Sequence, residues 1–512
     1  MTRSAEDIGA GLAAARPARP IRPGERIHVV GAAGAGASAA ALLAAGAGAT
    51  VTGCDPGGPS PYTPALEAAG IDVAWRHDPA HVTEDPRPDR LAVTKALTAV
   101  EPNHPELVAA RVLGIPEEPW QQVIADAAVG RTLVAVAGTH GKSTTAGWLT
   151  HVLALAGADP SAFVGALLPG SVTGGLASTA RRGRGAAFVV EADEYAGNFA
   201  AYRPSIVVLT NIEWDHPDVF ADRDAVVAAF EAWLRAADPS ALPTVIANVD
   251  DPGVGDLLAR LADWPAPVVG TRVGSLDDGR PAAFDRSITA EIVEAGLSET
   301  VVVIAGLDPA RAVPVRLPTA GAHNVANAMG VAGAALALGI ATGQIVSGLE
   351  SFEGVGRRLE RKGAARDVAV YDDYGHHPTA IRATIAAVRQ REPGRRLWVA
   401  IEPLTFHRTA ALLEELASAL AEADGVAVAD IWAGRDPDQT IASAARLAEA
   451  VQRLRADLPV AATGSPEDTA DWLAGMVRPG DVVLAMGGGR SYRIPERLLE
   501  RLSMHDGTTP EA

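Results

Sequence analysis

One pattern constrains the fold of this chain more than any other. Three stretches, which begin near Ile27, Thr132 and Val368, repeat the same order of a short apolar strand, a glycine-rich or acidic turn and an alanine-rich helix. Such alternation favours parallel sheets covered by helices. At 512 residues the chain is also too long for one core and is expected to form about three domains. We therefore predict an α/β fold with a loose N-terminal arm at 1–25 and domains at 26–126, 127–354 and 355–512.

Composition excludes several classes of function. The formal net charge is -18, which argues against nucleic acid or an anionic membrane as the main partner. Apolar runs are broken by glycines and are shorter than the roughly 20 residues of a membrane-spanning helix. Cys54 is the only cysteine, which excludes an intrachain disulfide and a cluster of cysteines around a metal and fits a cytoplasmic setting. The first 25 residues lack the apolar core of a signal peptide. Monomer and homodimer both stay open.

A glycine loop lies between the strand that begins at Thr132 and the helix that follows it. The backbone N-H groups of such a loop can turn toward phosphate, and the start of the helix adds the positive end of its dipole. Lys142 would neutralise phosphate oxygens, and the Ser143 hydroxyl could bind Mg²⁺. The full phosphate-loop pattern needs a glycine where Val136 stands, and the alternative is a plain turn with a solvated lysine. The candidate nucleotide-binding residues are Gly138, Thr139, His140, Gly141, Lys142, Ser143 and Thr144.

Two later strands end in groups that could hold metal ions. The run FVVEADE places Glu191 at the end of an apolar strand, where it could complete a Mg²⁺ site with Ser143. The run TNIEWDH places Asp215 and His216 after the next strand. A neutral imidazole is an unusual but possible ligand for a second ion. A capping aspartate with a buried, hydrogen-bonded histidine is an equally good interpretation.

Amides and arginines follow further along the chain. Asn324 and Asn327 in AHNVANA can each make two hydrogen bonds to a purine edge, although asparagine before a helix is usually a cap. Arg357 and Arg358 in GVGRRLE could grip a γ-phosphate or a developing acyl phosphate, although such a pair is more often a surface charge pair. The run YDDYGHHP then places four titratable groups within six residues, which is unfavourable unless something binds there: Asp372, Asp373, His376 and His377.

The first glycine loop supports a different class of enzyme. Gly34, Gly36 and Ala39 match a dinucleotide-binding fingerprint, and Asp55 follows at the distance of a ribose-binding acid. An NAD-dependent oxidoreductase is therefore an alternative hypothesis. A hydride-transfer enzyme, however, has no use for a GKS loop with a metal-binding carboxylate and paired arginines.

Taken together, the motifs resemble the Mur ligases, the ATP-dependent amide-forming family of peptidoglycan synthesis. GTHGKST, EADE, TNIEWDH, HNVANA, FEGVGRRLE and DDYGHHPT occur in the order of that family, and the resemblance runs from about Ile27 to Leu499. It implies a Rossmann-like UDP-binding domain, a central P-loop ATPase-like domain with a parallel sheet, and a C-terminal Rossmann-like domain that closes over the substrates. In that family the shortened glycine loop binds ATP, so Val136 is no objection.

The resemblance also implies an activity. DDYGHHP, EADE and the histidine of GTHGKS are most similar to the branch that joins L-alanine to UDP-N-acetylmuramate, with ATP and Mg²⁺ as cofactors. The branch of cell-wall recycling that attaches a murein tripeptide is the near alternative, and a homologue without catalytic activity is a third possibility. Related ligases carry a carbamylated lysine after the DH pair, whereas this chain has no lysine between His216 and Ala241.

Residue roles carried over from the family fall into three groups. Lys142 should contact the ATP phosphates, with Ser143 and Glu191 on one Mg²⁺ and Glu191 and His216 around a second. Asn324 and Asn327 should lie at the adenine and Arg358 near the γ-phosphate, while Asp373 and His376 should serve the ribose and the incoming amine. The candidate substrate-binding residues are Gly34, Gly36, Ala37, Ser38, Asp55, His216, His376 and Arg408.

Three segments depart from the family pattern. Thr94 to Leu97 reads TKAL where the family usually has paired serines, and Pro403-Leu404-Thr405 replaces a Pro-His-Arg. The run MGGGRSYRI also differs from the usual Met-Gly-Ala-Gly-Asp. These departures leave ATP chemistry intact but leave the acceptor amino acid open.

Overall fold

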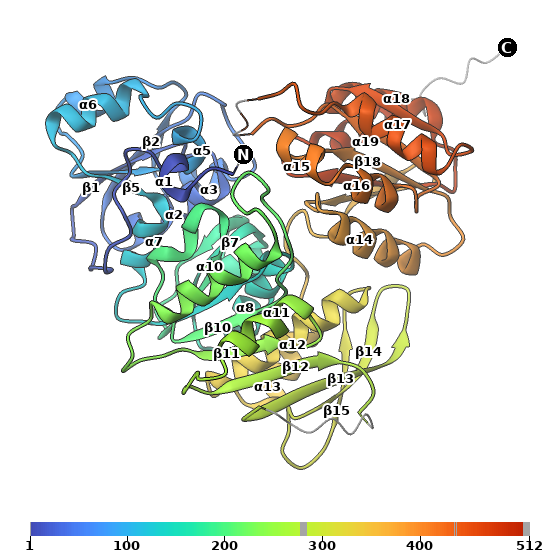
Figure 1. Cartoon of the computed structure of the whole chain (residues 1–512), viewed down its shortest axis with the longest axis horizontal. Helices are drawn as coiled ribbons and strands as arrows, with labels where there is room; N and C mark the ends of the chain where they lie inside the picture. The colour runs from blue at the N-terminus through green and yellow to red at the C-terminus, as the bar shows by residue number, and fades with distance from the viewer. Residues whose placement is uncertain (1, 277–283, 435, 437, 505–512) are drawn as a thin grey trace. The chain divides into compact units, whose positions relative to one another are not determined.

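Three sheets organise the chain (Figure 1). The computed structural model describes residues 2–276, 284–434, 436 and 438–504. By their internal contacts the residues form two compact units. The first comprises Met1–Val293, Val301–Pro318 and Asn324–Gly356, and the second Glu294–Thr300, Thr319–His323 and Arg357–Ala512.

The first sheet has five parallel strands in the order β3-β2-β1-β4-β5. Its strands are β1 (Arg26–Val30), β2 (Thr50–Cys54), β3 (Asp72–Ala74), β4 (Arg90–Val93) and β5 (Glu117–Pro119). Helices α2 (Ala35–Gly46) and α7 (Trp120–Ala127) pack against each other beside it. The strand order reverses on either side of β1, so the turn after β1 lies at the edge where ligands gather in open parallel sheets.

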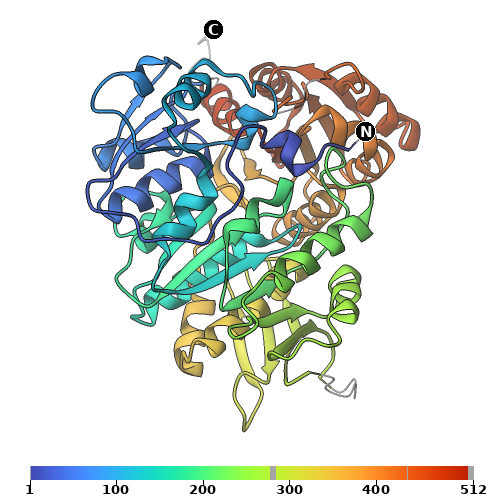
Figure 2. The same cartoon turned by 60° about the vertical axis from the view of Figure 1, so that its left-hand side comes forward.

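The second sheet has ten strands in the order β15-β14-β13-β12-β11-β10-β6-β9-β7-β8 and runs from the green to the yellow segments (Figures 1 and 2). Strands β6, β9 and β10 at its centre are parallel and apolar. Helix α8 (Lys142–Leu155) follows β6. The strands are β6 (Thr132–Ala137), β7 (Ser161–Leu168), β8 (Ser178–Arg181), β9 (Ala187–Ala192), β10 (Ile206–Leu209), β11 (Thr244–Asn248), β12 (Val268–Val273), β13 (Arg286–Ala295), β14 (Thr300–Ala305) and β15 (Val313–Leu317).

The third sheet lies in the second unit and has the order β16-β17-β21-β18-β19-β20. Its first strand is antiparallel to its neighbour and the others are parallel. The strands are β16 (Glu360–Ala365), β17 (Val368–Asp373), β18 (Leu397–Glu402), β19 (Gly425–Ala429), β20 (Val460–Gly464) and β21 (Val482–Gly487). The three sheets confirm the predicted α/β class. They fall within 26–126, 127–354 and 355–512, although the domain limits themselves stay predictions.

The N-terminal residues differ from the predicted loose arm. Helix α1 (Ala5–Ile8) has a capping box formed by Ser4 and Asp7. The carbonyl of Ile8, whose side chain is fully buried, accepts a hydrogen bond of 2.7 Å from Thr98. Arg16 pairs with Glu118 and Asp126 at 2.6 and 2.7 Å. Because these partners lie about a hundred residues away, the local sequence gave no sign of them.

Among the described residues, no helix combines the length and the apolarity that crossing a bilayer would take. The glycines within the apolar runs divide them into short elements, as in helix α2, whose twelve residues pack on the first sheet.

Candidate active site

The glycine loop between β6 and α8 has a backbone that requires glycine at two positions. Gly138 and Gly141 have φ values of 135° and 80°, a region that side-chain-bearing residues rarely adopt. A Cβ atom on Gly141 would lie 2.4 Å from Asn327 Oδ1. The loop is held from β10, because Asn211 Oδ1 accepts from His140 N at 2.8 Å and Thr210 Oγ1 donates to the His140 carbonyl at 2.6 Å. The loop backbone is thus fixed before any ligand binds.

Lys142 folds back over this loop rather than into solvent. Its side chain is 11% exposed, and Nζ donates to the Gly138 carbonyl at 2.6 Å and to Glu194 Oε2 at 3.0 Å. Asp193 Oδ1 lies 3.4 Å from the same nitrogen. Burial opposes the charge, but the neighbouring carboxylates outweigh it and hold the pKa of Lys142 above its usual value. The alternative of a solvated lysine is therefore wrong, and a buried positive charge stands at the loop.

Ser143 and Glu191 are brought together as the sequence predicted. Ser143 Oγ donates to Glu191 Oε1 at 3.0 Å, and Gly165 N donates to the other carboxylate oxygen at 2.6 Å. Both oxygens of Glu191 are therefore oriented by the fold. A hydroxyl and a carboxylate at the start of a phosphate-loop helix form the kind of oxygen-rich site that Mg²⁺ prefers.

His216 lies beside two carboxylates that the sequence analysis did not single out. One ligand atom each from Asp193, Glu194 and His216 lies within 4.8 Å of the others, and His216 Nε2 is 3.9 Å from Glu194 Oε1. That Glu191 and His216 share an ion stays a prediction, and Asp193 and Glu194 are further acids beside His216. Glu191 is within strand β9 and points to Ser143, whereas Asp193 and Glu194 follow the strand in the loop. The same EADE run contained the signal, but strand alternation beyond residue 192 could not be read.

Glu194 is the most unusual acid at this site. It is 1% exposed, and burial raises its pKa while Lys142 lowers it. Its Oε1 is buried without a hydrogen-bond partner among the described residues. A buried carboxylate oxygen that faces an imidazole and a second carboxylate fits a cation better than it fits a closed core.

Asn324 and Asn327 lie on helix α12 (Ala322–Ala337). Both side chains are buried, and Asn327 Nδ2 donates to Asn324 Oδ1 at 3.3 Å. Asn327 also borders Gly141. The pair is therefore next to the loop, and its predicted place at the adenine stays a prediction.

Residues of the first glycine loop make packing contacts with other parts of the chain. Gly34 is the N-cap of α2, and a Cβ on Gly36 would lie 2.2 Å from the Trp120 ring, so helix packing alone requires this glycine. Ala37 is buried. Ser38 is fully buried, with its hydroxyl 3.0 Å from the Ala35 carbonyl and 3.1 Å from Thr179 Oγ1. The Ser38 side chain is thus engaged inside the protein, contrary to the expected substrate contact.

Asp55 is placed to shape the turn after β1. Its carboxylate accepts from Ala33 N at 3.1 Å and from Gly57 N at 2.8 Å. An aspartate bound in this way supports the backbone of the turn, and the carboxyl end of β1 is where the strand order reverses. A role for Asp55 in binding a sugar nucleotide stays a prediction.

In the second unit, the two neighbouring arginines have different environments. Arg357 is buried and donates to the Gly487 carbonyl at 2.8 Å, to Ser491 Oγ at 2.7 Å and to Asp372 at 3.2 Å. Arg358 lies over the Tyr374 ring, 4.9 Å from its centroid. Arg357 therefore acts as a structural cation, which leaves Arg358 as the candidate for phosphate.

The four titratable residues in YDDYGHHP also differ from one another in their environments. Asp372 is fully buried beside Arg357, and burial raises its pKa to about 6. Asp373 accepts from Leu359 N and Gly375 N, both at 2.7 Å. His377 caps helix α14 (Pro378–Arg391). The ring of His376 places Nδ1 2.9 Å from the Tyr374 carbonyl, and a carbonyl can only accept, so a neutral ring carries its proton on Nδ1.

The atypical third-domain segments face each other in the fold. Glu402 at the end of β18 is 2% exposed and accepts from Ser491 N at 2.7 Å, and burial raises its pKa to about 7. Ser491 belongs to the MGGGRSYRI run. Arg408, predicted to bind substrate, is 2% exposed on α15 (Phe406–Ala411) and donates to the Leu404 carbonyl at 3.4 Å. Sequence reasoning did not single out Glu402, because one acid after a strand is an ordinary feature.

Comparisons with known proteins cover all three sheets. The model described as Mur ligase family, catalytic domain, matches residues 26–132, the Mur ligase middle domain matches 136–335, and the Mur ligase glutamate ligase domain matches 357–489. A UDP-N-acetylmuramate–L-alanine ligase of Frankia casuarinae is 35% identical over 506 residues, which cover 93% of this chain and 98% of that protein.

Two solved structures are similar over a comparable length. A UDP-N-acetylmuramate-alanine ligase from Thermotoga maritima has a TM-score of 0.74 at 24% identity, covering 94% of this chain and 99% of the other. A murein peptide ligase from Psychrobacter arcticus has a TM-score of 0.71 at 26% identity, covering 95% of this chain and 100% of the other. The likeness therefore extends over nearly the whole length of each protein.

Proposed function

The chain belongs to the Mur ligase family, and we propose that it joins L-alanine to the carboxylate of UDP-N-acetylmuramate in an ATP-dependent reaction of cytoplasmic peptidoglycan precursor synthesis. The observation that carries the activity is the buried, charged Lys142 in a glycine loop bordered by Glu191, Asp193 and Glu194. The identity of the proposed substrates is inferred from the name of the relative that is 35% identical over 93% of the chain.

The residues at the loop fit a magnesium nucleotide. The backbone of 138–143, Lys142 and the Ser143 hydroxyl would bind the phosphates and one Mg²⁺ with Glu191, while Asp193, Glu194 and His216 would hold a second. The Glu194 oxygen without a hydrogen-bond partner is the observation that supports this fit. When bound, Mg²⁺ supplies positive charge to the phosphate oxygens.

The chemistry proceeds in two steps. A carboxylate oxygen of UDP-N-acetylmuramate attacks the γ-phosphorus, and the bond from phosphorus to the leaving oxygen of ADP breaks with its electron pair, which gives an acyl phosphate. Lys142 and Arg358 stabilise the charge that develops on the transferred group. Nitrogen of L-alanine then attacks the acyl carbon, and phosphate leaves as the amide forms.

A base must take the proton of the incoming amine. We assign this to His376, because the Tyr374 carbonyl fixes the proton on Nδ1 and so makes Nε2 the basic nitrogen. Asp373 is a positioning residue, since both its oxygens accept backbone N-H groups of the surrounding loops. Arg408 is buried in the same unit and supports the loop after β18.

Phosphate release tests the proposal. Purified chain is mixed with ATP, Mg²⁺ and UDP-N-acetylmuramate, and release is compared with L-alanine, L-serine, glycine, the L-Ala-γ-D-Glu-diaminopimelate tripeptide and no acceptor. We expect release with L-alanine that Lys142→Ala abolishes and Lys362→Ala leaves intact, because Lys362 pairs with Glu360 outside the loop. No release with any acceptor would refute the ligase assignment.

The murein tripeptide is the second candidate acceptor. The solved murein peptide ligase from Psychrobacter arcticus matches 95% of the chain, and the atypical PLT segment leaves the acceptor open. Release with the tripeptide and not with L-alanine would assign the chain to that reaction.

Oligomeric state, monomer or homodimer, is to be measured by light scattering in the same preparation.

A further inference from the structure

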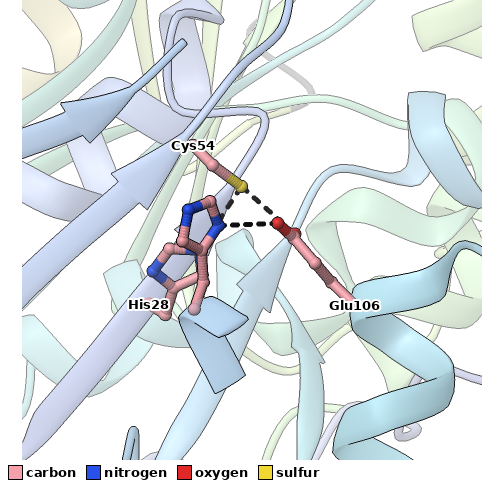
Figure 3. A group of neighbouring side chains, drawn as sticks. His28, Cys54 and Glu106 are labelled. Atoms are coloured by element: carbon pink, nitrogen blue, oxygen red, sulfur yellow. Dashed lines mark hydrogen bonds and ion pairs between the residues drawn. The ribbon is translucent and has the colours of Figure 1, made fainter. Parts of the chain in front are cut away.

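A second group of chemically active side chains lies in the first sheet, away from the glycine loop of β6. His28 is in β1 and Cys54 ends β2, while His81 is in α4 (Ala80–Thr83) and Glu106 is in α6 (Pro105–Leu113). His28, Cys54 and Glu106 are each at most 2% exposed. Figure 3 shows the Cys54 thiol and the Glu106 carboxylate pointing toward each other beside the His28 ring.

Two contacts of the Cys54 sulfur have nearly the spacing of ligands in a tetrahedral metal site, and His81 lies close to the same carboxylate. Cys54 Sγ lies 3.3 Å from His28 Nε2 and 3.2 Å from Glu106 Oε2, and Glu106 Oε1 lies 2.7 Å from His81 Nδ1. One ligand atom from each of the four residues falls within 4.8 Å of the others. Bond lengths of about 2.3 Å to sulfur and about 2.0–2.2 Å to nitrogen or oxygen place tetrahedral ligand atoms roughly 3.3–3.6 Å apart. Small adjustments would therefore centre an ion.

Three groups that can ligate a metal surround the Cys54 sulfur. It lies 3.3 Å from His28 Nε2 and 3.3 Å from His77 Nδ1, and its thiol donates to Glu106 Oε2 at 3.2 Å. His28 Nδ1 lies 2.8 Å from the Thr52 hydroxyl, which can accept the Nδ1 proton when Nε2 binds a metal ion. An imidazole oriented through its other nitrogen is typical of metal-binding histidines.

We propose that His28, Cys54, His81 and Glu106 bind one Zn²⁺ ion. A mixed set of thiolate, imidazole and carboxylate ligands suits this borderline-soft ion better than Mg²⁺ or Ca²⁺, which prefer oxygen. As the bond from sulfur to zinc forms, the thiol proton passes to solvent. Asp78 N, which donates to Glu106 Oε1 at 2.6 Å, and His77 would then support the ligands from outside.

The four ligands come from two strands and two helices, so the ion would be structural. It would tie α4 and α6 to the middle of β1 and the end of β2. Cys54 immediately precedes Asp55, whose carboxylate holds the turn after β1 through Ala33 N. Zinc would thereby stiffen the turn at which the sugar nucleotide is proposed to bind, while taking no part in the chemistry at Lys142.

Zinc content is measured first, on the full chain purified without a histidine tag and without chelator. We expect about one zinc ion per chain in the wild type and in the control His151→Gln, whose histidine contacts Ser351 outside the cluster. The variants Cys54→Ser and His81→Gln should lose most of it. Wild-type chain that contains no zinc and takes up none from added Zn²⁺ would overturn the proposal.

Cobalt substitution then identifies the ligands. Because Cys54 is the only cysteine, a thiolate-to-cobalt absorption band in the near ultraviolet can come from this site alone. We expect the band in the wild type, its displacement by Zn²⁺, and binding at least about tenfold weaker in His81→Gln. If Cys54→Ser does not fold, the wild-type band and His81→Gln decide the matter. An absent band, or one of unchanged affinity in His81→Gln, would refute the site.

Discussion

The substitution Gly141→Ala tests the fit between the glycine loop and its support. Gly141 and Gly130 have nearly the same φ, 80° and 81°, but a Cβ on Gly141 would lie 2.4 Å from Asn327 Oδ1 whereas one on Gly130 meets nothing within 4 Å. The left-handed backbone costs about 1–2 kcal/mol in either variant. Crowding against the buried Asn327 adds about 1–3 kcal/mol in Gly141→Ala alone. The matched pair therefore separates backbone strain from steric fit.

Thermal unfolding measures both terms. One kcal/mol shifts the Tm of a domain of 150–250 residues by about 2–4 °C, so we expect a loss of about 2–8 °C for Gly130→Ala and about 4–20 °C for Gly141→Ala. Adding Asn327→Ala to Gly141→Ala should recover the steric part, seen as non-additivity of about 1–3 kcal/mol. Equal losses in the two single variants, or strict additivity, would show that Asn327 does not confine the loop.

Three further predictions concern buried groups elsewhere. Arg90→Leu should destabilise the first unit by about 3–5 kcal/mol, because fully buried Arg90 pairs with three carboxylates within 3.0 Å. The loss should be larger than that of Arg16→Leu, and chemical denaturation measures the free energy of unfolding of both variants. Gly36→Ala should lower Tm through steric crowding against the Trp120 ring, whereas Gly130→Ala should lower it through backbone strain alone. Burial raises the pKa of Glu402 to about 7, so between pH 4.5 and 7 the folded form binds a proton that the unfolded form has lost. The free energy of unfolding should therefore fall by on the order of 3 kcal/mol as pH rises through this range. Glu402→Gln should flatten the profile of Tm against pH.

The fold could be predicted from the sequence because its signals are local. Strand β6, the glycine loop and α8 follow one another in the chain, so the apolar run, the glycines and Lys142 identify the unit without distant information. The pairing of Ser143 with Glu191 could be predicted for a similar reason, since parallel strands bring their carboxyl ends to one edge. The sequence order of motifs was enough to identify the family.

The errors arose where contacts are distant or where one glycine serves packing. Gly36 fits a dinucleotide fingerprint, yet Trp120 on another helix explains it. Arg16 is held by carboxylates about a hundred residues away, so the terminal segment looked unsupported. Asp193 and Glu194 were not singled out beside His216, because the direction of a side chain in a loop after a strand does not follow alternation. Each error concerns geometry that periodicity does not encode.

The charges at the glycine loop suggest why nucleotide and metal binding belong together. Lys142 and Glu194 form an ion pair, and both side chains are almost completely shielded from solvent. If Lys142 turns to phosphate oxygens, Glu194 loses its cation, and a buried carboxylate without a partner is strongly unfavourable. His216 and Asp193 stand where they and Glu194 can share a divalent ion instead. In this arrangement Lys142 compensates the charge of the acidic side chains, and if phosphate drew the lysine away, a divalent ion at the same carboxylates would replace its charge.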